Sequence, residues 1–446
     1  MQQRAARILV FSVLSFSALH LAGQIATENE RAASRSLSRS DRDAVIASVE
    51  ATVRSEYVFP AKTAGIIERL EQARKSGHYA VDDAGLLAQR ITQDLASASS
   101  DRHLYLVYDP ARYALETQTP AATTAEGDAY DRLASLRDNS GLTEMKILPG
   151  NIRYLKIARF GWIDDTTGEA YDSAMRFLSA GDAIIIDLRG NPGGDGAAVR
   201  YLVSHFLPPG TLEFSFFAGT DAPQQSRALD YLPAGRIKGK PLYVLIDGNV
   251  ASAAESFAYD VQQFKLGELV GAKTIGAANN NKFVPISPGF MLSVSYGRPV
   301  HVVSGTNWEG VGVEPSVSSP PAQALVTTER LALLRLKQAS GVATDRIADY
   351  DWALAGVDAQ LHPLSPSPAQ LQPLTGQYGK VTIELQDGAL TMSRTGRPTE
   401  RLIPLTSDGL FGVEASDLLR VRFASDSIQI LFRGDPGPPT IRRTSR

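Results

Sequence analysis

Residues 183–196 read AIIIDLRGNPGGDG, a continuous apolar run followed by a polar, glycine-rich turn. The run has the length of a strand, and its lack of alternation is typical of a strand buried on both faces. Residues 242–249, LYVLIDGN, repeat this pattern, and a segment with helical spacing follows each run. Strand and helix therefore alternate, which predicts an α/β domain over residues 145–321.

Regions on either side of this domain have a different texture. Apolar residues at helical spacing predict an N-terminal helical module over residues 40–110, which ends in a strand at 104–108. Residues 112–140 are rich in Ala, Thr and Asp and are expected to form a linker or flexible arm. Short alternating segments separated by turn residues predict a small all-β domain over residues 370–446.

Composition excludes several classes of protein. The chain has 446 residues, which is typical of two or three domains. Its net charge of -3 argues against a dedicated nucleic-acid binder, which usually has a basic face. The chain has no cysteine, so disulfides, thiolate metal sites and a cysteine nucleophile are all impossible.

The N-terminus has the pattern of a secretory signal peptide over residues 1–23. Arg4 and Arg7 precede an apolar stretch, residues 8–22, which is followed by a polar run. A membrane anchor is the alternative, but the stretch is short for a span and contains three serines. We therefore expect cleavage near Ala22 or Gly23, a periplasmic or secreted protein, and no stable membrane span after cleavage.

The ends of the two buried strands are the places where chemistry is expected, because loops and helix N-termini converge there. The second strand is followed by Ser252, which begins a helix. One interpretation is structural: Ser252 caps the helix, with Glu255 three residues later completing a capping box. The other is functional: Ser252 is a nucleophile, and the N–H of Ala253 faces a developing oxyanion.

The glycine-rich turn that contains Gly193 and Gly194 also has two interpretations. The glycines permit positive φ angles, or they present backbone amides to an anion. The segment is neither a P-loop nor a dinucleotide-binding fingerprint, so an oxyanion hole is the better functional hypothesis.

A serine nucleophile needs a base, and histidine is the usual one. No histidine spacing resembles a zinc site, so we expect neither a metal nor another cofactor. The chain has six histidines: His20, His78, His103, His205, His301 and His362. His20 lies in the signal peptide, His78 and His362 lie in connections, and His205 lies at the far end of a helix. His103 and His301 remain as candidates.

Three segments together resemble the C-terminal-processing (tail-specific) serine peptidases: residues 183–194, 245–255 and 307–315. The resemblance is greatest to the branch that contains the tricorn core protease and the repeats of interphotoreceptor retinoid-binding protein. It covers roughly residues 40–320 and implies a crotonase-like ClpP/tail-specific protease fold for the catalytic domain. A PDZ domain is not expected, because only about 40 residues separate the end of the helical module from position 150, and a domain needs more.

The resemblance implies roles for six residues. Ser252 matches the nucleophile, His103 the base of the tricorn-like branch, and Glu309 the glutamate that assists it. The oxyanion amides fall on Ala253 and on the turn of Gly193 and Gly194.

Two departures from the family pattern leave alternatives open. Some members use a lysine as the base, but its position here is Ala277, and Lys273 and Lys282 are only close in sequence. A serine normally precedes the histidine and links it to the glutamate, whereas this chain has Arg102. Glu309 would then reach His103 directly, through water, or through another hydroxyl such as that of Thr306.

The sequence thus predicts a serine peptidase that acts on a peptide or protein substrate through an acyl-enzyme. The main alternative is a non-catalytic protein that binds a hydrophobic ligand or peptide on the same fold, and an esterase is a third possibility. The sequence does not indicate the substrate or the oligomeric state.

Overall fold

The computed structural model describes residues 36–118, 132–133, 135–161, 165–219, 222–435 and 437–445. The predicted signal peptide, residues 1–23, lies outside this part, as do residues 119–131 of the predicted arm. No helix within the described ranges has both the length and the apolar character needed to cross a bilayer. The described residues fall into two compact units, drawn from Met1–Lys146, Tyr154–Ala180 and Ile185–Pro321, and from Ile147–Arg153, Gly181–Ile184 and Ala322–Arg446.

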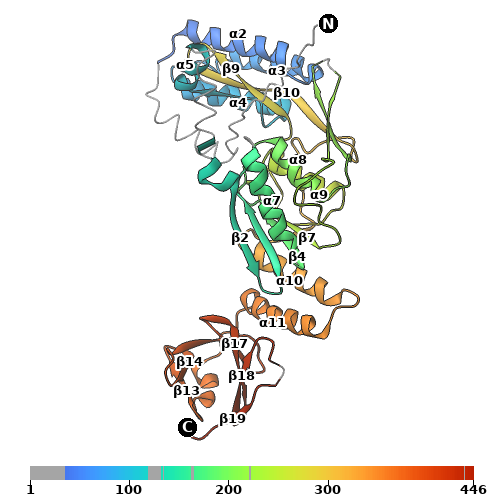
Figure 1. Cartoon of the computed structure of the whole chain (residues 1–446). Coiled ribbons are helices and arrows are strands. Elements are labelled where there is room, and N and C mark those ends of the chain that lie inside the picture. Colours follow the sequence, from blue (N-terminus) through green and yellow to red (C-terminus); the bar gives the residue numbers. More distant parts are fainter. Residues whose placement is uncertain are drawn as a thin grey trace. The chain divides into compact units, whose positions relative to one another are not determined.

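The first unit begins with helices that pack on a long strand hairpin (Figure 1). Ser38 and Asp41 form a capping box that starts α2, in which Asp41 N–H donates to Ser38 Oγ at 3.1 Å. The buried faces of the helices share one core with Phe290 and Leu292 of the hairpin, so the helical module is not an independent folding core. The helices are α2 (Arg39–Glu56), α3 (Pro60–Lys75) and α4 (Ala84–Ser99), and the hairpin strands are β9 (Asn280–Ile286) and β10 (Phe290–His301).

Strand β1 (Tyr105–Tyr108) ties the N-terminal helices to the rest of the unit. It pairs antiparallel with β10, and Tyr105 lies opposite Ser293. β10 also pairs with β9 and with β5, which in turn pairs with β6. This pairing fixes the turn that precedes β1, and therefore His103, beside β10.

A second sheet, with strand order β11-β8-β7-β4-β3-β2, carries the two strands singled out from the sequence. All five residues of β4 and all five of β7 are buried, as their continuous apolar runs predict. Because β4 and β7 are neighbours, the loops that follow them emerge side by side. The strands are β2 (Leu142–Leu148), β3 (Ile152–Ile157), β4 (Ala183–Asp187), β7 (Leu242–Ile246), β8 (Glu268–Gly271) and β11 (Val317–Ser318).

Helices follow both of these strands and complete the alternation. α8 begins after the glycine-rich turn and α9 begins after Ser252, and the two helices contact each other. The remaining elements before residue 322 are α5 (Pro110–Gln118), α7 (Asp165–Ser179), α8 (Gly196–Ser204), β5 (Leu212–Ala218), β6 (Gln224–Arg227), α9 (Ala253–Gln263) and the short 3-10 turn Asn139–Gly141.

The second unit contains an antiparallel barrel of eight strands in chain order. Its ends are joined by Gln377 N–H donating to Ser445 O at 2.8 Å and Thr444 N–H donating to Gln377 O at 2.7 Å. Buried apolar side chains, including Tyr378 and Val421, form the core of this barrel. The strands are β12 (Gly376–Tyr378), β13 (Val381–Gln386), β14 (Ala389–Arg394), β15 (Glu400–Pro404), β16 (Leu410–Val413), β17 (Ser416–Ala424), β18 (Ser427–Phe432) and β19 (Thr440–Arg442).

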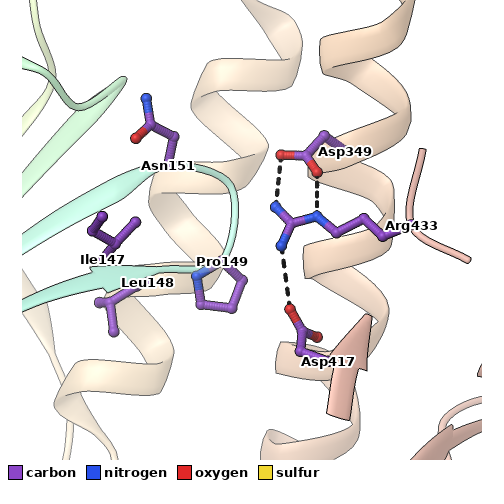
Figure 2. A pocket seen from close by; sticks show the side chains of 7 residues that line it. All are labelled: Ile147, Leu148, Pro149, Asn151, Asp349, Asp417 and Arg433. Carbon is purple, nitrogen blue, oxygen red and sulfur yellow. Dashed lines mark hydrogen bonds and ion pairs between the residues drawn. The ribbon is translucent and has the colours of Figure 1, made fainter. Parts of the chain in front are cut away.

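Three helices precede the barrel in the second unit: α10 (Ala324–Gln338), α11 (Thr344–Leu361) and α12 (Pro368–Leu371). Arg433 of the barrel bonds both carboxylate oxygens of Asp349 on α11, at 2.5 and 2.9 Å, and reaches Asp417 at 3.3 Å. These three residues and Ile147, Leu148, Pro149 and Asn151 line a pocket of about 390 Å³ (Figure 2). None of the site residues expected from the sequence lines it.

The predicted fold class is confirmed: an α/β domain with N-terminal helices and a C-terminal all-β barrel. One prediction is wrong in part, because residues 112–118 of the expected arm lie in helix α5. The sequence also gave no sign of α11.

Candidate active site

Ser252 lies at a strained turn between strand β7 and helix α9. Its φ of 52° and ψ of -119° are unusual for a residue other than glycine. Such backbone strain costs of order 1–3 kcal/mol and persists only where the surrounding structure enforces it. A strained serine between a buried strand and a helix is the arrangement that exposes the nucleophile in α/β-hydrolases.

Glu255 is fully buried and bonds the backbone of this turn. Ser252 and Glu255 have the arrangement of a capping box, but only the half in which Ser252 N–H donates to Glu255 Oε2, at 3.0 Å, is a regular hydrogen bond. Burial raises the pKa of Glu255 to about 7, against the opposing effect of its hydrogen-bond donors. The structural interpretation therefore holds for Glu255, while Ser252 Oγ makes no side-chain cap hydrogen bond.

The glycine-rich turn packs directly against Ser252. A Cβ on Gly193 would lie 2.9 Å from Ser252 Cβ and 3.0 Å from Ala253 N, so only glycine allows this approach. Gly193 N–H donates to Asn191 Oδ1 at 2.8 Å and is therefore occupied. Within the described ranges, the N–H groups of Gly194 and Ala253 donate to no protein acceptor, which leaves these two amides available to an oxyanion.

Asn191, which sequence reasoning did not single out, joins the two loops. The buried side chain donates from Nδ2 to Ile157 O at 2.9 Å. The backbone carbonyl of Asn191 accepts Ala251 N–H at 3.1 Å. Asp247 makes a second link, because its Oδ1 accepts the N–H groups of Gly190 and Asn249 at 3.0 and 2.9 Å. A polar residue directly before Pro-Gly-Gly was the available signal for Asn191.

His103 and Glu309 face each other, with 3.9 Å between Nδ1 and Oε2. This is an ion-pair separation that exceeds a hydrogen bond. Burial lowers the pKa of His103, but Glu309, Asp101 and Glu255 together outweigh it, and the pKa lies above the ordinary 6.5. Burial raises the pKa of Glu309, but His103 and the backbone N–H donors lower it by more. The net pKa is therefore lowered, and the carboxyl stays ionised.

Arg102 contributes its backbone and not its side chain. Arg102 N–H donates to Glu309 Oε1 at 3.0 Å, while the side chain is exposed. Thr306 is also exposed, and its backbone groups bond Ser304 and His301. Neither residue stands between Glu309 and His103 in the way a relay serine would.

One short segment connects the serine side of the site to the histidine side. The N–H groups of Gly276 and Ala277 donate to Glu255 at 2.6 and 2.8 Å. The next two N–H groups, of Ala278 and Asn279, donate to Glu309 at 2.7 and 2.8 Å. Four successive amides are therefore shared between two carboxylates, so residues 276–279 link Glu255 to Glu309.

The lysines considered as alternative bases have other partners. Lys273 Nζ lies 2.8 Å from Glu314 Oε1, and Lys282 Nζ lies 2.8 Å from Glu56 Oε2. Both side chains are nearly half exposed. Ala277, at the position where the resemblance would place a lysine, is buried. His301, the second histidine candidate, is buried 3.3 Å from Asp260 and not beside Glu309.

Asp101, His103 and Glu309 have ligand atoms within 4.8 Å of one another, which is the composition of a possible metal site. Three backbone N–H groups already bond Glu309, and His103 N–H bonds Asp101 Oδ1 at 2.8 Å. We therefore interpret the group as an ionisable cluster around the histidine and assign it no metal.

Two family models match the chain. Residues 151–319 match peptidase family S41, and residues 32–135 match the N-terminal domain of Peptidase S41 in eukaryotic IRBP. The resemblance seen in the three sequence segments is thereby confirmed.

Curated relatives match over part of their length. A carboxy-terminal-processing protease of Bartonella bacilliformis is 24% identical over 211 residues, 45% of this chain and 46% of the relative. The carboxy-terminal processing protease CtpB of Bacillus subtilis is 24% identical over 179 residues, 40% of this chain and 35% of the relative. The chain thus spans less than half the length of these relatives.

Among solved structures, the photosystem II D1 C-terminal processing protease is 17% identical to this chain. The match covers 64% of this chain and 94% of that protein, with a TM-score of 0.40.

Proposed function

We propose, from the premise that this chain belongs to peptidase family S41, that it is an exported serine peptidase acting through an acyl-enzyme on Ser252. The observation that carries the proposal is the strained backbone of Ser252 beside two amides without a protein acceptor, those of Gly194 and Ala253. Strain of this kind is retained where a side chain must be presented for chemistry.

The proposed mechanism uses Ser252, His103, Glu309 and two backbone amides. His103 takes the hydroxyl proton of Ser252 as Oγ attacks a peptide carbonyl, and Glu309 stabilises the imidazolium that forms. The amides of Ala253 and Gly194 bond the oxyanion, a contribution of about 3 kcal/mol for one such donor. The imidazolium then protonates the leaving amine, and water activated by His103 hydrolyses the acyl-enzyme.

The substrate class is a peptide or protein, in keeping with the names of the curated relatives. Export is supported by the charged and apolar pattern of residues 1–23. N-terminal sequencing of the protein recovered outside the cytoplasm should begin close to Gln24, and an uncleaved Met1 would favour the membrane-anchor alternative.

The test of activity is hydrolysis of a peptide library followed by mass spectrometry. Ser252→Ala should abolish product formation, because no other group replaces the nucleophile. Ser256→Ala, one helical turn later on α9, is the matched control and should keep wild-type turnover. Equal product from Ser252→Ala and the wild type would disprove the role of Ser252 as nucleophile. No product from the wild type with any peptide would leave the non-catalytic binding protein as the better explanation.

A further inference from the structure

Asp101 is a buried carboxylate that no part of the proposed mechanism uses. Its Oδ1 accepts the backbone N–H of His103, two residues on, at 2.8 Å. This bond is an Asx-type turn, in which an aspartate side chain fixes the local backbone. The position from which the His103 ring projects is therefore set by Asp101.

The other oxygen of Asp101 faces the glutamate side of the site. Asn279 Nδ2 donates to Asp101 Oδ2 at 3.3 Å, and the backbone N–H of the same Asn279 donates to Glu309 Oε2 at 2.8 Å. One buried asparagine thus holds both carboxylates. The three groups Asp101, His103 and Glu309 come within 4.8 Å of one another, so two anions flank one imidazole.

Glu309 by itself does not complete a short hydrogen bond to the histidine. The separation from His103 Nδ1 to Glu309 Oε2 is 3.9 Å, and Nδ1 has no hydrogen-bond partner in the described part of the chain. Arg102, at the position of the missing relay serine, offers only its backbone N–H, and that bonds Glu309. A nearby second anion compensates for this loose contact, because an imidazolium is stabilised by every negative charge within a few ångströms.

We infer that Asp101 is a positioning residue for His103, a second carboxylate that fixes the backbone of the histidine and shares the stabilisation of its imidazolium with Glu309. The inference rests on the proposed function, in which His103 is the base. It explains how the site retains a charged partner for histidine although Arg102 stands where the relay serine is expected.

Two further ionisable groups face this cluster. Tyr57, at the end of α2, faces Asp101 and Glu309, and Glu255 of α9 raises the pKa of His103. Burial and Glu309 raise the pKa of Asp101, whereas the pKa of Glu309 is lowered. The two carboxylates therefore shift in opposite directions, because Glu309 has His103 and backbone donors beside it while Asp101 is held next to the charge of Glu309.

Asp101→Asn is the variant that isolates the charge. An asparagine retains an acceptor for His103 N–H, and the amide of Asn279 can turn over because its Oδ1 has no partner in the described ranges. With less negative charge near the ring, the pKa of His103 falls, so the acid limb of the kcat/KM profile moves to lower pH. At the plateau, kcat should fall by about tenfold, because the imidazolium formed in the transition state is less stabilised.

The matched control is Asp94→Asn. Asp94 is an equally buried carboxylate of the same helical module, but it bonds Tyr79 and Arg69 instead of the histidine loop. It should lower the melting temperature without moving the pH profile. If Asp101→Asn does not fold, Asp101→Ser replaces it, since a serine hydroxyl can accept the same His103 N–H. An acid limb and kcat that match those of Asp94→Asn would overturn the inference.

A second readout separates this inference from the proposed function. The pKa of His103 is measured by NMR titration in Ser252→Ala, with and without Asp101→Asn, and needs no turnover. A fall on removal of the charge supports the role of Asp101 even if the wild type cleaves no peptide. An unchanged pKa refutes that role even if the peptidase is active.

Discussion

Glu255 Oε2 accepts the backbone N–H of Ser252 at 3.0 Å, and Glu255 Oε1 accepts the hydroxyl of Thr274 at 2.5 Å. One buried carboxylate therefore joins the turn that carries the serine to the segment that precedes Gly276. A shared anchor of this kind keeps the nucleophile and its surroundings in a fixed relation.

Thr274→Val tests this anchor. The hydroxyl of Thr274 lowers the pKa of Glu255, so its removal raises that pKa above about 7 and favours the neutral acid at neutral pH. Val313 N–H also loses its acceptor, at 2.7 Å, which should cost about 1–3 kcal/mol of unfolding free energy. We expect kcat/KM at pH 7 to fall several-fold and to recover as pH rises, measured across a pH series with chemical denaturation.

Thr306→Val is the control for Thr274→Val, because Thr306 is exposed. It should leave the stability and the pH series unchanged. A Thr274→Val enzyme whose loss of activity is the same at every pH would contradict the role given to the Glu255 carboxylate.

Glu309→Gln should move the acid limb of the pH profile downward. Glu309 is the main group that raises the pKa of His103, and without its charge the neutral imidazole persists to lower pH. At the plateau, kcat should fall by at least about tenfold, because the imidazolium loses its nearest anion. The measurement is kcat/KM against pH.

The control is Glu314→Gln, which removes an exposed carboxylate paired with Lys273. It should leave both kcat and the acid limb in place. If Glu309→Gln behaves like Glu314→Gln, Glu309 does not act on the histidine.

Gly194→Ala should destroy the oxyanion site. The residue has φ of +133°, and a Cβ there would lie 1.9 Å from Phe160 O, so the backbone must shift. Loss of one oxyanion donor lowers the rate by roughly 10²–10³. We expect a decrease of this size in the rate of labelling by a fluorophosphonate, together with a lower melting temperature.

Gly196→Ala provides the comparison, because its Cβ would meet no atom within 4 Å. It lies in the first turn of α8, where alanine favours the helix. If the fluorophosphonate labels both variants at the wild-type rate, the Gly194 amide is not needed to stabilise the oxyanion.

Arg433→Met should destabilise the second unit without affecting catalysis. The guanidinium bonds Asp349 through two nitrogens and also reaches Asp417 (Figure 2). Because Asp349 and Arg433 are partly exposed, the loss should be only about 1–2 kcal/mol. Thermal unfolding measures the loss, and Arg397→Met, at an exposed position, is the control. An unchanged melting temperature for Arg433→Met would show that this ion pair is not stabilising.

Much of the α/β domain was predictable because its strongest signals are local. The continuous apolar runs at 183–187 and 242–246 are fully buried strands, and helices follow them as expected. The pairing of β1 with β10 was not predicted, because it joins residues far apart in the sequence, such as Leu106 and Leu292. For the same reason, the sequence indicated a separate helical module, whereas its core includes Phe290.

The candidate site shows the same limit. The resemblance assigned Ser252, His103 and Glu309, and their roles remain a prediction. Residues that act through long-range contacts were missed. Asp101 and Asn191 are ordinary polar residues in the sequence, and only the folded chain brings Asp101 beside Glu309 and puts the Asn191 carbonyl on Ala251 N–H. Local reasoning also could not choose between the two glycine amides, because the bond from Gly193 N–H to Asn191 Oδ1 depends on the fold.

The central claim is that Ser252 is an activated nucleophile, and covalent labelling tests it most directly. The folded protein is treated with a fluorophosphonate, digested, and mapped by mass spectrometry. The account predicts a single adduct on the peptide that contains Ser252, lost in Ser252→Ala and after heat denaturation. No adduct on the folded wild type, or an adduct that persists in Ser252→Ala, would contradict it.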